Sequence, residues 1–301
     1  MKFMKEYIAI IIIVLLLPYV ATMLFQGRAF VQETAVFQVS GNEALAEDTK
    51  EEALVGALAA AIPVSYPKEV LKAQAVLLRT QLARESTADE TASGTVKSYS
   101  IEEMKELWGA EEFPGYYARL QDAVEETAGQ IITYEGEPAY APYHAVSAGY
   151  TRDPAGLFKE GEYPYLKSVD CSTDVEADSF LSISYYSARE FNEKLTEAFD
   201  VTFEEEALLE NIQIEETDRA GYVIALLLGT KEMSGEEFRQ GMKFSSASFV
   251  IEEFEGNIRV VTKGRGHGIG FDQYQAKKLA EEGKQMKELL NYFFDGIQIK
   301  E

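Results

Sequence analysis

The chain has 301 residues and is strongly acidic, with 51 Asp and Glu against 28 Lys and Arg and a formal net charge of −23. This field repels polyanions, so nucleic acid is excluded as a partner and anionic polymers and lipid surfaces are disfavoured, whereas a neutral ligand such as a sugar is not. The single cysteine, Cys171, excludes an internal disulfide and a Cys-rich zinc site.

The N-terminal residues 1–28 have the pattern of a membrane anchor. Lys2 and Lys5 precede an uncharged run over 7–26, which as a helix would rise about 30 Å, the thickness of a bilayer core. The run exceeds the apolar region of a cleaved signal peptide, the alternative, and no A-x-A cleavage site follows it. We predict a single-pass cell-membrane protein whose C-terminal part is extracytoplasmic.

The next segment, 29–52, is acidic and lacks a sustained period, which predicts a linker or stalk. A folded domain is expected over 53–301. Its first helix spans 67–84, where Leu71 and Leu78 begin one apolar stripe. Glu69 precedes Lys72 by three residues, so the two can form a surface ion pair, or Glu69 can serve as an acid at a cleft edge.

The middle of the chain alternates helix and strand signals. Amphipathic helices are predicted over 101–109 and 116–129, each ended by glycine. A hairpin should follow, turning at 135–136, with 143–151 as its second strand and exit. His144 and Ser147 lie in that strand, but no G-x-S-x-G motif accompanies them, which argues against a serine nucleophile.

Further hairpins are predicted around Asp218 to Gly221 and around 255–256, with a helix between them that Ser234 caps together with Glu237. A strand is also expected to run into a helix over 180–195. Together these signals predict an α+β domain of mixed helices and antiparallel hairpins.

The stretch GRGHGIGFDQYQAKK begins at residue 264. It matches neither G-x-G-x-x-G nor a phosphate loop, so nucleotide binding is disfavoured. Alternating glycines let another backbone or a ligand approach closely, so the stretch is either a structural corner or a cleft lining. Asp272 should cap a helix that ends at Gly283. A second helix and a C-terminal edge strand should follow.

Four motifs occur here in the order found in the SpoIID/LytB family of stage II sporulation protein D and amidase enhancers, which the chain resembles from about residue 51 onward. They are LKAQAVLLRT, YHAVSAGYT, ETDRAGYV with EEFRQGM, and GRGHGIGFDQYQAKKLAEEG. The resemblance implies a role at bacterial peptidoglycan in sporulation. It also implies lytic transglycosylase activity on glycan strands during engulfment, and partners among cell-wall amidases or other sporulation membrane proteins.

One departure from the family pattern bears on catalysis. The family has a glutamate before Met-Pro, where this chain has Ala61, so Glu69 is the remaining candidate acid. Ala145, Ala148 and Gln275 also replace usual family residues. The alternative is therefore a weakened or inactive glycan-binding enhancer or scaffold for a partner amidase.

The resemblance assigns substrate binding to polar and aromatic residues of the matching motifs. These are Lys72, Gln74, Arg79, His144, Ser147, Tyr150, Thr151, Arg265, His267, Gln273 and Tyr274. Possible metal ligands are His144, His267 and Cys171, but no two are closely spaced in sequence. We therefore predict neither a metal nor a cofactor.

Overall fold

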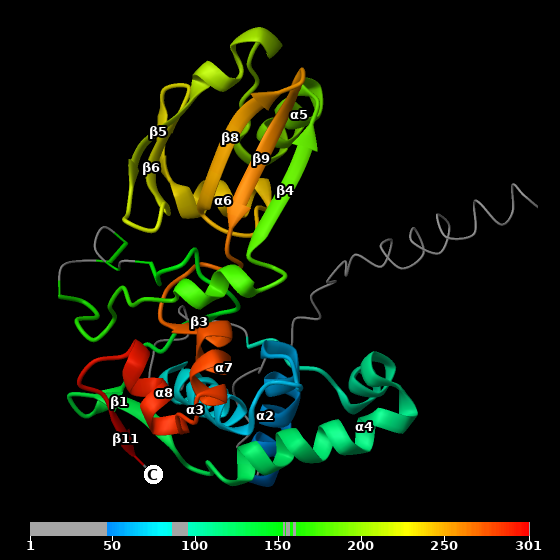
Figure 1. Ribbon diagram of the computed structural model, residues 1–301, viewed down its shortest axis with the longest axis vertical. Helices are drawn as coiled ribbons and strands as arrows, with labels where there is room; N and C mark the ends of the chain where they lie inside the picture. The colour runs from blue at the N-terminus through cyan, green and yellow to red at the C-terminus, as the bar shows by residue number, and fades with distance from the viewer. Residues whose placement is uncertain (1–46, 86–95, 153, 155–156, 159–160, 301) are drawn as a thin grey trace, which may run out of the picture. The chain divides into compact units, whose positions relative to one another are not determined.

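The computed structural model describes residues 47–85, 96–152, 154, 157–158 and 161–300 (Figure 1). The chain divides into two compact units, Met1–Val36 and Phe37–Glu301, and every described residue lies in the second. The predicted anchor, 1–28, lies outside the described residues. The first described helix, α2, begins at Glu47, inside the segment predicted as linker.

The predicted single-pass localisation is corrected by the helices that the structure describes, none of which is both long and apolar enough to cross a membrane. The longest helix among the described residues, α4 (Ile101–Glu125), carries Glu102 and Glu103 in its first turn and Pro114 in its interior. Burying such charges in a bilayer core is costly.

Helices α2 (Glu47–Ala61), α3 (Lys68–Glu85) and α4 build the first part of the domain. The predicted apolar stripe of α3 is confirmed, because Leu71 and Leu78 are fully buried. Ser100 caps α4 in a reciprocal capping box with Glu103. The backbone of Gly109 is non-helical, with φ 76°, so the predicted break between two helices is confirmed inside α4.

The predicted hairpin after α4 is only half right. Strand β1 (Ile131–Tyr134) pairs with the short β2 (Glu137–Pro138) around the expected turn. The expected second strand does not join it. Instead β3 (Tyr143–His144) pairs in parallel with β10 (Phe271–Asp272). The sequence signal for a hairpin therefore predicted the turn correctly, but it did not predict that β3 would pair with a strand more than a hundred residues later in the chain.

The following elements form two antiparallel sheets, in the orders β4-β9-β8 and β5-β6-β7. The expected hairpins β5–β6 and β8–β9 are both present. The bounds are β4 Leu181–Tyr186, α5 Ala188–Phe199, β5 Ile212–Thr217, β6 Val223–Leu228, β7 Lys231–Ser234, α6 Gly235–Met242, β8 Ser248–Phe254 and β9 Asn257–Lys263. The predicted capping box of Ser234 and Glu237 starts α6.

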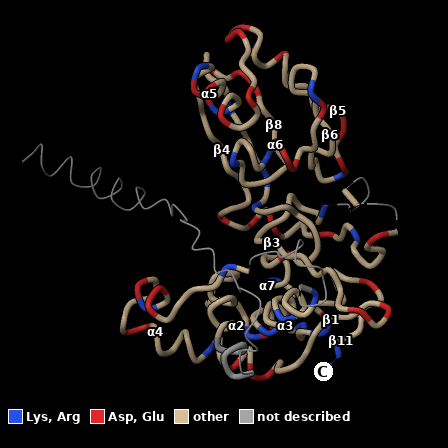
Figure 2. The backbone as a smooth tube through the Cα atoms, turned by 180° about the vertical axis from the view of Figure 1, so that it is seen from behind, with Lys and Arg blue, Asp and Glu red and all other residues tan. Residues whose placement is uncertain are grey.

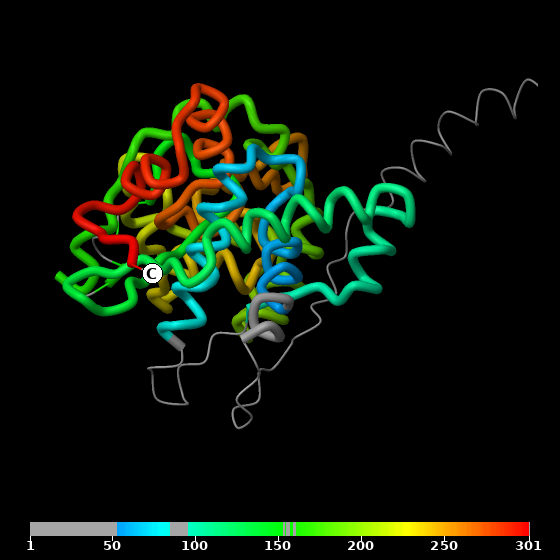
Figure 3. Tube along the Cα trace, turned by 90° about the horizontal axis from the view of Figure 1, so that it is seen from below, coloured from blue at the N-terminus to red at the C-terminus, as the bar shows by residue number. Residues whose placement is uncertain are grey.

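The C-terminal part contains α7 (Gln273–Glu281), α8 (Met286–Phe293) and β11 (Gln298–Lys300). The predicted edge strand is confirmed, since β11 pairs antiparallel with β1 at the edge of the sheet β11-β1-β2. Figure 3 shows this C-terminal segment beside the hairpin that follows α4.

Two hydrophobic clusters hold these elements together and confirm the predicted α+β class. One joins α2, α3 and α4 with α7 and α8, with Leu58 and Phe293 fully buried. The other, with Phe191 and Phe238, lies among α5, α6 and the later strands. Acidic side chains are spread over helices and loops throughout (Figure 2).

Candidate functional site

The glycine-rich segment, 264–270, packs directly against the backbone of 142–147. Its four glycines all have positive φ. A Cβ on Gly266 would lie 2.8 Å from the Cβ of His144, and one on Gly270 only 2.3 Å from the carbonyl oxygen of Pro142. The backbone N–H of Arg265 donates to the carbonyl of Val146 at 2.7 Å. The close approach predicted from the glycines is therefore confirmed, and what approaches is another stretch of this chain.

Asp272 lies at the centre of this junction and is fully buried. Its Oδ1 accepts hydrogen bonds of 3.0 Å from the backbone N–H groups of Tyr274 and Gln275, so it caps α7 as predicted. Its Oδ2 accepts from the backbone N–H of Ser147 at 2.7 Å and lies 3.0 Å from Nε2 of His144. One side chain thus joins the start of α7 to the mid-chain segment.

The protonation of His144 follows from its second contact. Its Nδ1 lies 3.1 Å from the carbonyl oxygen of Ile269, which can only accept, so Nδ1 carries a proton. Burial lowers the pKa of His144 to about 4, which leaves the ring neutral and Nε2 an acceptor. Burial raises the pKa of Asp272, so the carboxyl group of Asp272 supplies the proton between them.

A second carboxyl group, Asp174, lies in the 3₁₀-helix η2 (Ser172–Glu176) and is fully buried. Its Oδ2 accepts from both the backbone N–H and the hydroxyl of Ser147, each at 2.7 Å. Burial and the neighbouring Asp272 raise the pKa of Asp174 to about 9. Burial also raises the pKa of the Cys171 thiol. The cluster is therefore uncharged near neutral pH.

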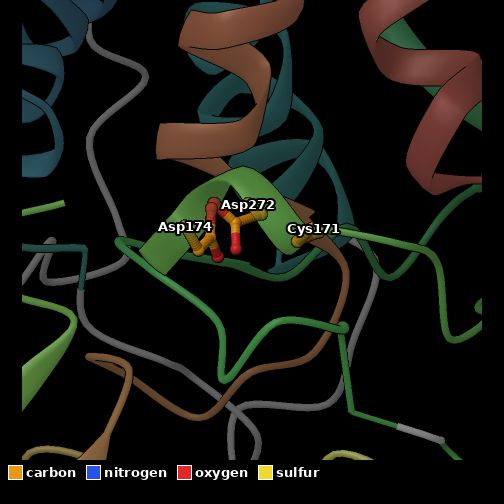
Figure 4. A group of neighbouring side chains, drawn as sticks. All are labelled: Cys171, Asp174 and Asp272. Carbon is orange, nitrogen blue, oxygen red and sulfur yellow. The ribbon is translucent and has the colours of Figure 1, made fainter. Parts of the chain in front are cut away.

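Figure 4 shows Cys171, Asp174 and Asp272 gathered beside η2. Each offers one ligand atom, and the three atoms lie within 4.8 Å of one another. Among the described residues, these are the ones that the geometry offers as ligands for a metal ion.

His267 comes close to this cluster, with its ring centre 5.8 Å from that of His144. Its Nδ1 accepts from the backbone N–H of Ile269 at 3.1 Å. Burial, followed by the proximity of His144, lowers the pKa of His267 to about 3. The structure therefore brings together the buried His144 and Ser147 with the partly buried His267, and all three side chains are neutral.

The predicted residues of α3 lie elsewhere and tie helices to one another. The carboxylate of Glu69 accepts from Lys72 at 3.0 Å and from the backbone N–H of Met286 at 2.8 Å, so it caps the start of α8. Arg79 donates to the carbonyl oxygen of Val124, in the last turn of α4, and to that of Gln130, which follows the helix. Glu69 thus forms an ion pair with Lys72 on the helix surface, which is one of the two roles that the sequence predicted for it.

Gln74 and Gln273 meet in the interior between α3 and α7. The side-chain amide of Gln273 donates to Oε1 of Gln74 at 3.0 Å and to the carbonyl oxygen of Ala61 at 2.8 Å. Both glutamines are buried. They connect the end of α2 to the start of α7.

The remaining predicted residues are dispersed. Thr151 is buried and donates to the carbonyl of Lys167, and the ring of Tyr150 lies 4.2 Å from the guanidinium of Arg219. Arg265 has an exposed side chain, whereas Tyr274 is partly buried. The structure does not bring these four side chains to one point.

Sequence reasoning missed two residues of the junction. Asp174 lies four residues after Asp170, and Cys171 lies between them. This short stretch has no hydrophobic periodicity and no motif that would single out Asp174. Arg152 is 1% exposed; it donates to the carbonyl of Val223 at 3.0 Å and lies 3.5 Å from Glu236. The position of Arg152 directly after the YHAVSAGYT motif was the one sequence feature that could have indicated its place in the junction.

Comparisons with known proteins agree with the motifs. A family model described as "Stage II sporulation protein" matches residues 41–134. Stage II sporulation protein D of Bacillus subtilis (strain 168) is 30% identical over 274 residues, covering 87% of this chain and 77% of that protein. Its counterpart in Bacillus amyloliquefaciens is 29% identical over 272 residues, covering 83% and 74%. The amidase enhancer of Bacillus subtilis (strain 168) is 23% identical over 304 residues, covering 82% of this chain and 40% of that protein.

Proposed function

This chain belongs to the SpoIID/LytB family of stage II sporulation protein D and the amidase enhancer, and from this membership we propose that it acts at the bacterial cell wall in sporulation. It binds peptidoglycan glycan strands and supports a partner amidase, without cutting the glycan itself. The net charge of −23 permits a neutral sugar ligand.

The observation that carries this proposal is the identity and place of residue 61. The resemblance assigns the family's acid to this position, which Ala61 occupies at the end of α2. The hydrogen bond from the side chain of Gln273 to the carbonyl oxygen of Ala61 holds residue 61 beside the start of α7, which follows the glycine-rich segment. Glycosidic cleavage needs an acid that protonates the leaving oxygen, and a methyl group cannot do this.

The carboxyl groups of Glu69, Asp174 and Asp272 do not take over the role of that acid. Both oxygens of Glu69 already accept from donors on this chain, Lys72 and the backbone of Met286. Asp174 and Asp272 have no exposed surface, so a polymer cannot reach them.

A surface suited to sugars lies near Ala61. The ammonium of Lys277 lies 5.6 Å from the ring centre of Tyr66 and 5.3 Å from that of Tyr274, and both rings are partly buried. Aromatic rings offer an apolar face for the C–H face of a sugar and a hydroxyl for its polar edge. Burial raises the pKa of Tyr66 to about 12, so its hydroxyl remains a donor. We assign glycan contact to this surface.

Sedimentation with purified peptidoglycan sacculi tests the binding. The wild-type protein should co-sediment, and Tyr66→Ala and Tyr274→Ala should each weaken binding about 10-fold, in line with a loss of about 1.4 kcal/mol. Tyr185→Ala, at an exposed tyrosine on β4, is the matched control and should bind normally. Equal binding by all four proteins would remove this surface from the proposal.

Digestion of the same sacculi tests the absence of cleavage. We expect no anhydro-sugar products from the wild-type protein, whereas a partner amidase should release peptides faster in its presence. Anhydro products that disappear in Glu69→Ala would instead establish a lytic transglycosylase. An amidase rate that the protein leaves unchanged would contradict the supporting role.

A further inference from the structure

The edge strand β4 differs from the other edge strands of the three-stranded sheets that the structure describes. These sheets have the orders β11-β1-β2, β4-β9-β8 and β5-β6-β7. The free side of an edge strand offers backbone N–H and C=O groups to any other strand, and proteins guard such edges with charged side chains or proline. The other edge strands are guarded in this way, by Lys300 in β11, Glu137 and Pro138 in β2, Glu252 and Glu253 in β8, Glu215 and Glu216 in β5, and Lys231 and Glu232 in β7. In contrast, β4 has the sequence LSISYY, with neither a charge nor a proline.

Strand β4 also exposes large apolar side chains. Leu181, Ile183 and Tyr185 share one face of the sheet, because residues two apart in a strand point the same way. They are 50%, 47% and 54% exposed, and contiguous exposed apolar side chains mark interaction sites. One side of β4 pairs with β9 along all six residues. Figure 1 shows its other side at the outer edge of the sheet, with no described strand beside it.

The residue pattern of β4 is the same in both directions. Apolar residues at 181, 183 and 185 alternate with Ser182 and Ser184. In an antiparallel pair, directly opposed side chains lie on the same face and contact each other. Two copies of β4 paired about Ile183 would therefore set Leu181 of each copy against Tyr185 of the other, and Ser182 against Ser184. Apolar side chains would meet on one face and hydroxyl groups on the other, which is the self-complementarity that a twofold interface requires.

We propose that β4 pairs in antiparallel fashion with β4 of a second copy of this chain, centred on Ile183. The two sheets β4-β9-β8 then form one continuous six-stranded sheet, and the free backbone groups of β4 gain partners. A single short strand buries less than the roughly 800 Å² per partner that a stable interface has. We therefore expect a dimer that dissociates readily.

The charge of the chain sets the salt dependence of this dimer. Two chains that each carry a net charge of −23 repel each other, whereas the paired strands themselves are uncharged. Salt screens charges that lie more than about 8 Å apart at 0.15 M ionic strength. Association should therefore strengthen as salt is added, whereas a contact that depends on ion pairs would weaken.

Disulfide cross-linking of the full-length protein tests the register. In the proposed pair the two Ile183 residues face each other with Cα atoms about 4.5–5.5 Å apart, a separation that a disulfide spans. Ile183→Cys should therefore give a covalent dimer on oxidation, and the native Cys171 should not interfere because it is fully buried. Ile214→Cys, at a 41% exposed position on the guarded edge strand β5, is the matched control and should remain monomeric. No cross-link in Ile183→Cys, or equal cross-linking in both variants, would overturn the proposal.

Sedimentation velocity of the wild-type protein provides a test that does not depend on any variant. The sedimentation coefficient should rise with protein concentration in the micromolar range, and more steeply at high salt. Ile183→Lys sets two ammonium groups against each other and should raise the dimer Kd at least about 10-fold, whereas Ile214→Lys should leave it unchanged. A wild-type protein that stays monomeric, or a dimer that Ile183→Lys leaves intact, would contradict the pairing. Neither experiment involves glycan or an amidase, so both outcomes are independent of the proposed function.

Discussion

Glu69 and the Asp174–Asp272 pair are carboxyl groups in opposite situations. The side chain of Glu69 is 22% exposed, and its charge is balanced by Lys72 one helical turn away. The two aspartates are fully buried, and Ser147 and His144 supply their contacts from a different segment. Near the surface, water and a local cation accommodate a charge, whereas in the interior each lost partner leaves an uncompensated polar group.

Replacing Asp272 should have the largest effect and is the strongest test of this contrast. Asp272→Ala leaves the N–H groups of Tyr274 and Gln275 without their acceptor and removes one of the two acceptors of the Ser147 N–H. We expect a loss of about 3–5 kcal/mol in the free energy of unfolding, because a buried network is broken. Urea denaturation measures this loss.

Asp178→Ala, at an exposed position four residues after Asp174, is the control for Asp272 and should change stability by no more than about 0.5 kcal/mol. Similar losses from the two variants would contradict the view that burial makes the difference.

The packing of the glycine-rich segment against 142–147 supports the buried pair, and Gly270→Ala probes it. The new Cβ would lie 2.3 Å from the carbonyl oxygen of Pro142, at a φ of 73°. We expect a loss of about 2–4 kcal/mol from the clash and the left-handed backbone together.

Gly283→Ala separates these two causes. Gly283 has a φ of 98° and no atom within 4 Å of an added Cβ, so only backbone strain of about 1–2 kcal/mol is expected. Thermal melts of Gly270→Ala and Gly283→Ala give the comparison. Equal losses of stability would mean that the contact between the new Cβ at residue 270 and Pro142 is relieved without cost.

Acid should remove the contribution of His267 to the stability of the junction. The pKa of His267 falls from 6.5 to about 3 on folding, so below about pH 6.5 the unfolded chain takes up a proton that the folded chain does not. The contribution of His267 to stability is therefore lost as the pH falls, by on the order of 2 kcal/mol between pH 8 and pH 5. Asp174, whose pKa is raised to about 9 on folding, contributes with the opposite sign over this range.

His267→Gln should remove only the His267 contribution, since glutamine can still accept from Ile269 but does not titrate over this range. The difference in stability between the wild type and this variant should therefore change by on the order of 2 kcal/mol between pH 8 and pH 5. Urea midpoints across the pH series provide the measurement. A wild-type slope that persists unchanged in His267→Gln would show that other groups carry it.

Glu69→Ala should have the smallest effect, about 1 kcal/mol, because it removes one capping bond to Met286 and a partly exposed ion pair. Glu69→Gln keeps an acceptor for the N–H and should lose less. If Glu69→Ala lowered the free energy of unfolding as much as Asp272→Ala, burial would not explain the difference between the two carboxyl groups.

Much of the fold followed from local signals. The helix after Pro67, the turns at 135–136 and 255–256, and the cap of α6 by Ser234 depend on residues within a few positions of one another. The apolar stripe of α3 and the α+β class were predictable for the same reason. The pairing of β3 was not, because a two-residue strand carries no information about which distant edge it joins.

For the site, the sequence by itself indicated that His144, Ser147 and His267 lie in the motifs shared with the family, and it predicted that Asp272 caps a helix. Only the tertiary structure decided that Asp174 and Cys171 join them and that Glu69 does not. The physical reason is that a helix cap or a surface ion pair forms between near neighbours in sequence. A buried cluster forms where long-range packing excludes water, and this cluster needed bare glycine backbone to close around it.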